Sequence, residues 1–134
     1  MDDSASLRTI RTLYAALATG NVSAVVDLLD PQLTWVEAEG FPLSGTYRGP
    51  KAVMDGVLRR LATEWADFRT VPHEFIDGGA AVVALGTYSG TYKATGKSFQ
   101  APFAHVWKLA GGKVVSYVQY TDTALVARAL TNPE

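Results

Sequence analysis

Residues 98–121 read SFQAPFAHVWKLAGGKVVSYVQYT, two runs of aromatic and β-branched residues separated by a pair of glycines. Such runs, broken by short glycine-containing segments, are typical of antiparallel strands joined by tight hairpins. The chain holds two further runs of this kind just before. The breaks between the runs are Asp77-Gly78-Gly79, Thr95-Gly96-Lys97 and Gly111-Gly112. We therefore predict an antiparallel meander with strands at 68–76, 80–92, 98–109 and 113–121.

The first half of the chain has a helical pattern instead. Apolar residues recur at spacings of three and four over 5–18, with Ser4 as a plausible N-cap and Gly20 as the stop. Four more segments follow before the meander. These are a short helix capped by Asn21 and ending before Asp30-Pro31, a strand at 33–37, a Gly- and Pro-rich loop at 38–49, and a helix from Pro50 whose apolar stripe reaches Trp65. A last short helix is predicted at 122–130. Helices that precede most of the strands predict an α+β fold with the helices packed on one sheet face.

Composition excludes several classes of function. The 134 residues suit one domain spanning 1–134, and 48% apolar with 19% charged residues is ordinary for a globular protein. The net charge of -1 predicts no nucleic-acid or membrane partner. The absence of cysteine excludes disulfides, thiolate metal sites and cysteine nucleophiles. With no signal-like N-terminus and no apolar stretch of about 20 residues, the expected location is cytoplasmic.

Strand alternation divides the meander into two faces, and both carry aromatic residues. Phe103, His105 and Trp107 share one face of their strand. A two-residue loop at Gly111-Gly112 would set His105 beside Val118, whereas a bulge would shift that register by one residue. The face of the assembled sheet that carries His105 is therefore left open. Both faces need a cover, so we expect helices on one and a second copy of the chain on the other. That homodimer would bury Phe103, Trp107 and Tyr120.

Small residues in one strand predict a cavity. Ala84, Gly86 and Tyr88 share a face, and small residues in a row leave room beside large ones. Room next to Tyr88 and Tyr117 is what a small hydrophobic ligand needs. We expect the ligand to contact these two side chains together with Tyr14, Trp35 and Asp122.

Several segments resemble one known superfamily, and the likeness covers nearly the whole chain. They are Tyr14–Asn21, Trp35-Val36-Glu37, Pro42–Gly45, Ala101–His105, Gly112–Ser116 and Gln119–Thr123. In this order they resemble the ketosteroid isomerase-like and SnoaL-like branches of the nuclear transport factor 2-like superfamily, which includes polyketide cyclases. The resemblance implies a cone-like fold, with three N-terminal helices packed on a strongly curved, mostly antiparallel sheet around a central pocket.

The catalytic positions that the isomerase resemblance implies are only partly matched by residue type in this sequence. It places the general base on Glu37, the oxyanion-hole tyrosine on Leu13 with Tyr14 one place out of phase, and the oxyanion-hole aspartate on Ala104. Because losing one such donor costs about 100- to 1,000-fold in rate, authentic steroid isomerase activity is not expected. For the acid/base aspartate of the cyclases, the nearest positions are Gln119 and Asp122.

The candidate catalytic residues each have a structural alternative. Glu37 is either a base with a raised pKa or a strand-end carboxylate that reaches solvent or pairs with Arg48. His105 is either a general acid or donor, or a packed core residue, and Gln119 would orient a carbonyl group. Asp122 is alternatively the cap of the last helix.

No cofactor is predicted for this chain, and its two histidines suggest no metal site. The predicted function is cofactor-free proton transfer on a small hydrophobic carbonyl compound, as in an isomerase, cyclase or dehydratase. The alternatives are a non-catalytic small-molecule binder and a dimeric accessory protein.

Overall fold

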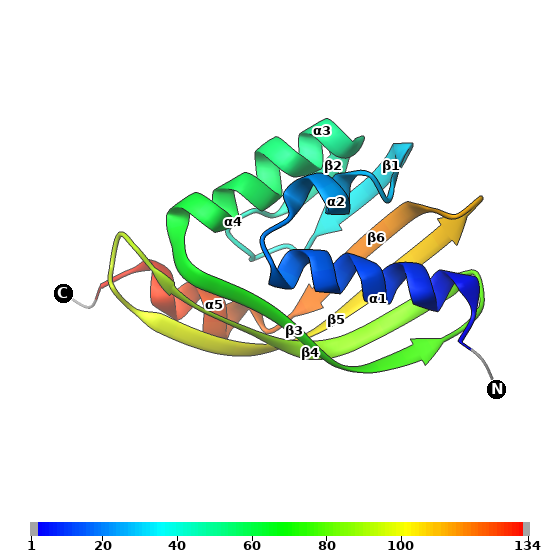
Figure 1. Ribbon diagram of the computed structural model, residues 1–134. Helices are drawn as coiled ribbons and strands as arrows, with labels where there is room; N and C mark the ends of the chain where they lie inside the picture. The colour runs from blue at the N-terminus through cyan, green and yellow to red at the C-terminus, as the bar shows by residue number, and fades with distance from the viewer. Residues whose placement is uncertain (1–2, 133–134) are drawn as a thin grey trace.

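A six-stranded sheet curls around the helices of the chain in the computed structural model, which describes residues 3–132 (Figure 1). The strands follow the order β2-β1-β6-β5-β4-β3, with β1 parallel to β6 and every other pair antiparallel. Their bounds are β1 Leu29–Glu37, β2 Gly45–Arg48, β3 Trp65–Asp77, β4 Ala81–Tyr92, β5 Ser98–Ala110 and β6 Lys113–Thr121. The predicted α+β fold, a curved and mostly antiparallel sheet with helices packed on it, is confirmed.

The three predicted N-terminal helices are all present. Helix α1 (Ala5–Ala18) is capped by Ser4, whose hydroxyl accepts from the Leu7 N–H at 3.0 Å, and Asn21 caps α2 (Val22–Val26) in the same way. The third helix is continuous from Pro50 to Glu64 and has a π-helical turn in its middle. Its parts are α3 (Pro50–Val53), η1 (Met54–Leu58) and α4 (Arg59–Glu64). Helix α5 (Thr123–Leu130) follows the last strand.

Tertiary packing moves three predicted boundaries. Strand β1 begins at Leu29 instead of 33, and the predicted loop contains the short strand β2, which pairs with the end of β1. Trp65 opens β3 instead of ending the third helix. Its ring packs 4.8 Å from that of Tyr92 and 5.1 Å from that of Phe99, measured between centroids, so contacts with distant strands override the helical period.

The β5–β6 hairpin contains the bulge that the sequence left open. Gly111 and Gly112 both have positive φ, as a two-residue hairpin loop requires. The register shift lies further along, between Lys108 and Leu109. Beyond it His105 lies opposite Gln119, where an unbroken ladder would have placed Val118.

The aromatic residues of β5 point to the concave face of the sheet and are buried there. Phe103, His105 and Trp107 are 4%, 3% and 1% exposed and face the helices. The prediction that Phe103 and Trp107 lie in a dimer interface is therefore wrong, because a single chain already buries them. Tyr120, 58% exposed, is on the other face.

That convex face carries a row of β-branched residues that crosses five strands in register. The row consists of Ile76, Val83, Val106, Val118 and Val36. Ile76 is 50% exposed and the other four are half-buried.

Gly86 does not leave the space that we predicted. A Cβ atom there would lie 2.2 Å from the carbonyl oxygen of Val71 and 2.5 Å from the Phe103 ring. The glycine instead lets the β3 backbone approach β4, which helps the sheet to curl. None of the helices in the described part of the chain is long and apolar enough to span a bilayer.

Candidate functional site

Four buried polar side chains from four elements meet at the centre of the concave face. Tyr14 comes from α1, Tyr88 from β4, His105 from β5 and Gln119 from β6. The Tyr14 hydroxyl lies 2.5 Å from His105 Nδ1, and the Tyr88 hydroxyl lies 2.5 Å from His105 Nε2. Gln119 Nε2 donates to the Tyr88 hydroxyl at 3.0 Å. The bulge in β6 is what brings His105 and Gln119 together.

Burial sets the protonation of this cluster. Desolvation holds the pKa of His105 well below its ordinary value, because an imidazolium would lose its hydration. Desolvation likewise raises the pKa of both the Tyr14 and the Tyr88 hydroxyl, so these groups stay protonated. Near neutral pH the cluster is uncharged.

Glu37 lies beside this cluster at the end of β1. Its side chain is on the same strand face as Trp35 and is 3% exposed. The Ala38 N–H next to it donates to Gln119 Oε1 at 2.9 Å, which ties the end of β1 to the cluster. The alternative of a solvent-exposed carboxylate is therefore wrong. So is pairing with Arg48, which lies opposite Thr34.

The Glu37 carboxyl is buried, and its Oε2 atom has no hydrogen-bond partner in the described part of the chain to offset the loss of water. Desolvation raises its pKa to about 8, and the nearby Trp35 side chain opposes this shift weakly. The Trp35 N–H does not reach hydrogen-bonding geometry with it. Glu37 Oε2 and Trp35 Nε1 are both buried without a hydrogen-bond partner among the described residues. Burying a donor and an acceptor without hydrogen-bond partners costs stability. A ligand with polar atoms could supply the missing hydrogen bonds to both groups.

The residues at the positions that the resemblance linked to an oxyanion hole lie as follows. The Tyr14 hydroxyl points into the core and accepts from Trp107 Nε1 at 3.0 Å, and the neighbouring Leu13 is fully buried. Ala104 lies on the convex face, and the next residue, His105, faces inward.

Two further predicted ligand contacts have structural partners. Asp122 caps α5 by accepting from the Leu125 N–H at 3.2 Å, and it is exposed, away from the cluster. Tyr117 packs against Trp35 with 3.9 Å between ring centroids, on the floor of the concave face. The structure thus brings together seven of the eight predicted residues and leaves Asp122 aside.

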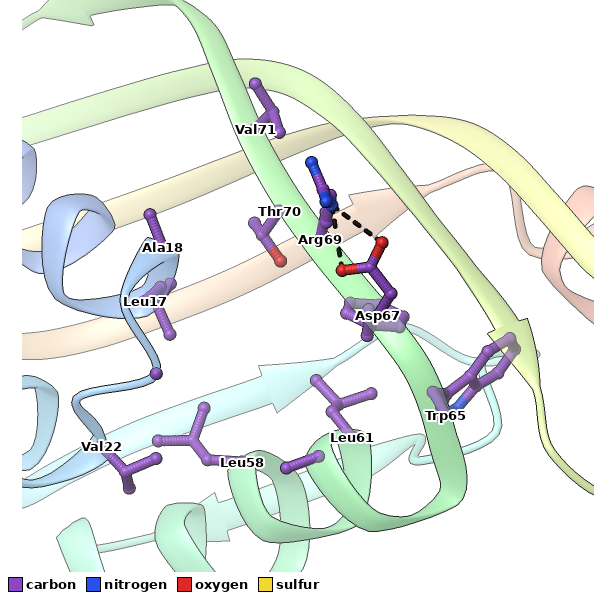
Figure 2. Close-up of a pocket in the computed structure, with 13 residues that line it drawn as sticks. Leu17, Ala18, Val22, Leu58, Leu61, Trp65, Asp67, Arg69, Thr70 and Val71 are labelled. Carbon is purple, nitrogen blue, oxygen red and sulfur yellow. Dashed lines mark hydrogen bonds and ion pairs between the residues drawn. The ribbon is translucent and has the colours of Figure 1, made fainter.

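A cavity lies to one side of this cluster. It has a volume of about 540 Å³ and is enclosed by the end of α1, α2, the third helix and the first turns of β3 (Figure 2). Figure 2 shows Leu17, Val22, Leu58 and Leu61 forming an apolar wall opposite β3. A neighbouring hollow of about 320 Å³ continues along α1 and β3, and Tyr14 lines it.

The cavity is displaced from the centre that we predicted. Aromatic rings fill that centre: Phe103 and His105 stack at 4.0 Å, and Tyr88 and Phe103 lie 4.6 Å apart. The lining of the 540 Å³ cavity includes neither Glu37 nor the cluster. Phe68 separates them, since it lines the cavity and packs 5.4 Å from the Tyr88 ring.

A bulge in β3 shapes the cavity rim, and sequence analysis missed it. The register shifts between Ala66 and Arg69, and Asp67 has φ of 54°, unusual for a residue other than glycine. Asp67 and Arg69 pair at 3.0 Å on the rim (Figure 2). The residue type offers only a weak signal, because aspartate tolerates positive φ better than most residues do. Within residues 3–132, no three His, Asp or Glu side chains gather as a metal site.

Comparison with known families agrees with this geometry. A family model described as a SnoaL-like domain matches residues 10–117. The chain belongs to the SnoaL-like family. The predicted resemblance to the nuclear transport factor 2-like superfamily is thus confirmed. No curated protein matches the chain significantly.

Three solved structures are similar to this SnoaL-like protein over almost the full length of each chain. An NTF2-like protein from Burkholderia thailandensis is 38% identical, with a TM-score of 0.92 over 98% of this chain and 100% of that one. An NTF2-like protein of unknown function from Burkholderia pseudomallei is 32% identical, with a TM-score of 0.88 over 96% and 99%. TerC, co-crystallized with polyporic acid, is 26% identical, with a TM-score of 0.85 over 95% and 98%.

Proposed function

We propose that this SnoaL-like protein binds a small, mainly apolar carbonyl compound between its helices and β3, and exchanges a proton with it through Glu37 without a cofactor. The observation that carries the proposal is the buried Glu37 carboxyl with its unpartnered Oε2. A carboxyl with a pKa of about 8 changes protonation state close to neutral pH, which is what a general acid or base needs.

The groups around Glu37 suit a ligand oxygen. Trp35 Nε1 is an unpaired donor on the same strand face, and the neutral side chains of Tyr88 and Gln119 lie within the adjoining cluster. Neutral donors stabilise a developing oxyanion less than charged ones do, so we expect slow exchange rather than high turnover. The apolar walls of the cavity favour the hydrocarbon part of such a ligand.

A second candidate function, non-catalytic binding, is favoured by the position of the cavity. Phe68 stands between the cavity and Tyr88, so a ligand in the cavity does not touch the cluster unless that ring moves. The catalytic proposal therefore requires that the Phe68 ring rotate to give the ligand access to the cluster. If the ring does not move, the apolar cavity alone would still hold a ligand.

Two measurements separate these functions. The first is hydrogen–deuterium exchange at the acidic carbons of 2-tetralone, a small apolar ketone, followed by NMR in deuterated water. The second is binding of polyporic acid, with which the relative TerC was co-crystallized, followed by quenching of the tryptophan fluorescence, to which Trp65 on the cavity wall contributes. Glu37→Gln removes the candidate base. Glu39→Gln makes the same change at an exposed position two residues away and is the matched control.

The proton-transfer proposal expects wild type and Glu39→Gln to exchange 2-tetralone faster than buffer does, and Glu37→Gln to fall to the buffer rate. Polyporic acid should bind all three proteins alike. Equal exchange by Glu37→Gln would contradict the catalytic role. Binding without any exchange would favour the non-catalytic function, and neither binding nor exchange would refute the proposal.

A further inference from the structure

The groups around His105 carry more hydrogen-bond donors than the contacts among them use. Trp107 Nε1 donates to the Tyr14 hydroxyl at 3.0 Å, and an indole N–H can only donate. Gln119 Nε2 donates to the Tyr88 hydroxyl at 3.0 Å. The direction of this amide is fixed because its Oε1 accepts from the Ala38 N–H. Each tyrosine oxygen therefore accepts one hydrogen bond before His105 is considered.

His105 adds a choice between two arrangements. Its Nδ1 faces the Tyr14 hydroxyl and its Nε2 faces the Tyr88 hydroxyl, both at 2.5 Å. Burial keeps the ring neutral, so one nitrogen carries a hydrogen and the other offers a lone pair. Counting only the Gln119 N–H that faces Tyr88, five donors thus share four contacts: the N–H groups of Trp107, Gln119 and His105 and the two tyrosine O–H groups.

We propose that His105 is a tautomeric switch that decides which tyrosine hydroxyl is free to bind an acceptor oxygen of the ligand. With its hydrogen on Nε2, His105 donates to Tyr88 and accepts from Tyr14, which leaves the Tyr88 O–H free. With its hydrogen on Nδ1, His105 donates to Tyr14 and accepts from Tyr88, which leaves the Tyr14 O–H free. The two states differ in one proton position and two hydroxyl rotations. His105 is thus a positioning residue.

The two tyrosines differ in their access to open space. Tyr14 lines the 320 Å³ hollow, whereas Tyr88 lines neither cavity, and its ring packs against Phe68, which lines the 540 Å³ cavity. The hydrogen bonds around His105 do not distinguish the two tautomers in the ligand-free chain, because each leaves one tyrosine O–H without a partner among the described contacts. A carbonyl or carboxylate oxygen that reaches Tyr14 would draw the hydrogen to Nδ1.

The tautomer can be measured directly, because NMR of ¹⁵N-labelled histidine distinguishes a protonated from a bare ring nitrogen. The chain has two histidines, and His73→Gln, an exposed change, assigns the signals. We expect Nε2–H in Tyr14→Phe and Nδ1–H in Tyr88→Phe. The reason is that a buried N–H without a partner costs more than a bare lone pair, so the hydrogen moves towards the remaining tyrosine. Each substitution removes only one hydroxyl group.

Two results would overturn the switch. They are an imidazolium at neutral pH, or the same tautomer in both phenylalanine variants. If one variant does not fold, the other and the wild type still decide the matter.

The choice of a carbonyl ligand for the switch rests on the proposed function. A titration with such a ligand tests the switch and the ligand separately. Adding 2-tetralone, whose polar atom is an acceptor oxygen, should increase the Nδ1–H fraction in the wild type and leave Tyr14→Phe unchanged. If the variants behave as expected and 2-tetralone changes nothing, the switch stands and the carbonyl ligand fails. An equal response in Tyr14→Phe would contradict the assignment of Tyr14 as the ligand-facing end.

Discussion

The protonation of Glu37 should be visible as a pH dependence of folding stability. Glu37→Gln keeps nearly the same side-chain shape and removes the titrating group. Because Glu37 Oε2 has no partner, the amide loses no hydrogen bond there. The variant should therefore fold, and it should differ from the wild type in how the free energy of unfolding changes with pH.

The magnitude follows from the two pKa values. The carboxyl pKa is about 8 in the folded chain, against 4.5 for an unperturbed glutamate. A pKa raised by folding leaves the stability intact below the lower value and costs stability as the pH rises towards the upper one. Linkage between these values predicts that the wild type loses about 4 kcal/mol relative to Glu37→Gln from about pH 5 to about pH 9. That is a large share of the 5–15 kcal/mol typical of a domain (an order-of-magnitude range).

The assay is urea unfolding followed by circular dichroism at several pH values in this range. His105 titrates as well, but with the opposite sign: its pKa is lowered by folding, so it costs stability as the pH falls below its ordinary value of 6.5. The difference between wild type and Glu37→Gln cancels that contribution, because both proteins contain His105. Glu39→Gln should follow the wild type. A difference in stability that does not change with pH, or a wild type that is the more stable protein at high pH, would refute the buried, protonated Glu37.

Two other predictions test the sheet. Gly86→Ala should destabilise the fold by about 3 kcal/mol or more in urea unfolding, because its Cβ would overlap the Val71 carbonyl oxygen; Gly90→Ala, on the same strand with nearest contacts of 3.3 Å, is the control and should cost clearly less. We also propose that the convex row containing Val106 forms a homodimer, so sedimentation should show a dimer at micromolar concentration and a folded monomer for Val106→Glu. The exposed change Lys93→Glu should remain dimeric, and a wild-type monomer at that concentration would contradict the interface.

The helices and the meander were predictable because they rest on local signals. Ser4 and Asn21 cap the first two helices with their side-chain oxygens. Gly111 and Gly112 form the hairpin loop, where positive φ is needed. Trp65 and the strand β2 were mispredicted, since their structure comes from pairing with residues far along the chain. Local patterns contain no information about such contacts.

The candidate site was predictable as a set of residues but not as an arrangement. Glu37, Tyr14 and Tyr88 were identified from strand alternation and family resemblance, and all three are buried on the concave face. The cavity was misplaced, because alternation shows which residues face inward but not whether their rings fill the space. The bulge at Asp67, which shapes the rim, depends on one residue with positive φ that no sequence pattern marks.

The extra residue in β6 has the largest consequence for chemistry. Without the register shift between Lys108 and Leu109, His105 would lie opposite Val118 and Gln119 opposite Ala104. Gln119 could not then reach both Tyr88 and Ala38, and the amide that fixes the direction of the network would be lost. A one-residue slip thus converts an apolar sheet face into a hydrogen-bonded cluster beside a buried carboxyl. The register shift thus creates the cluster. It also adds the Gln119 N–H to the hydrogen-bond donors around His105.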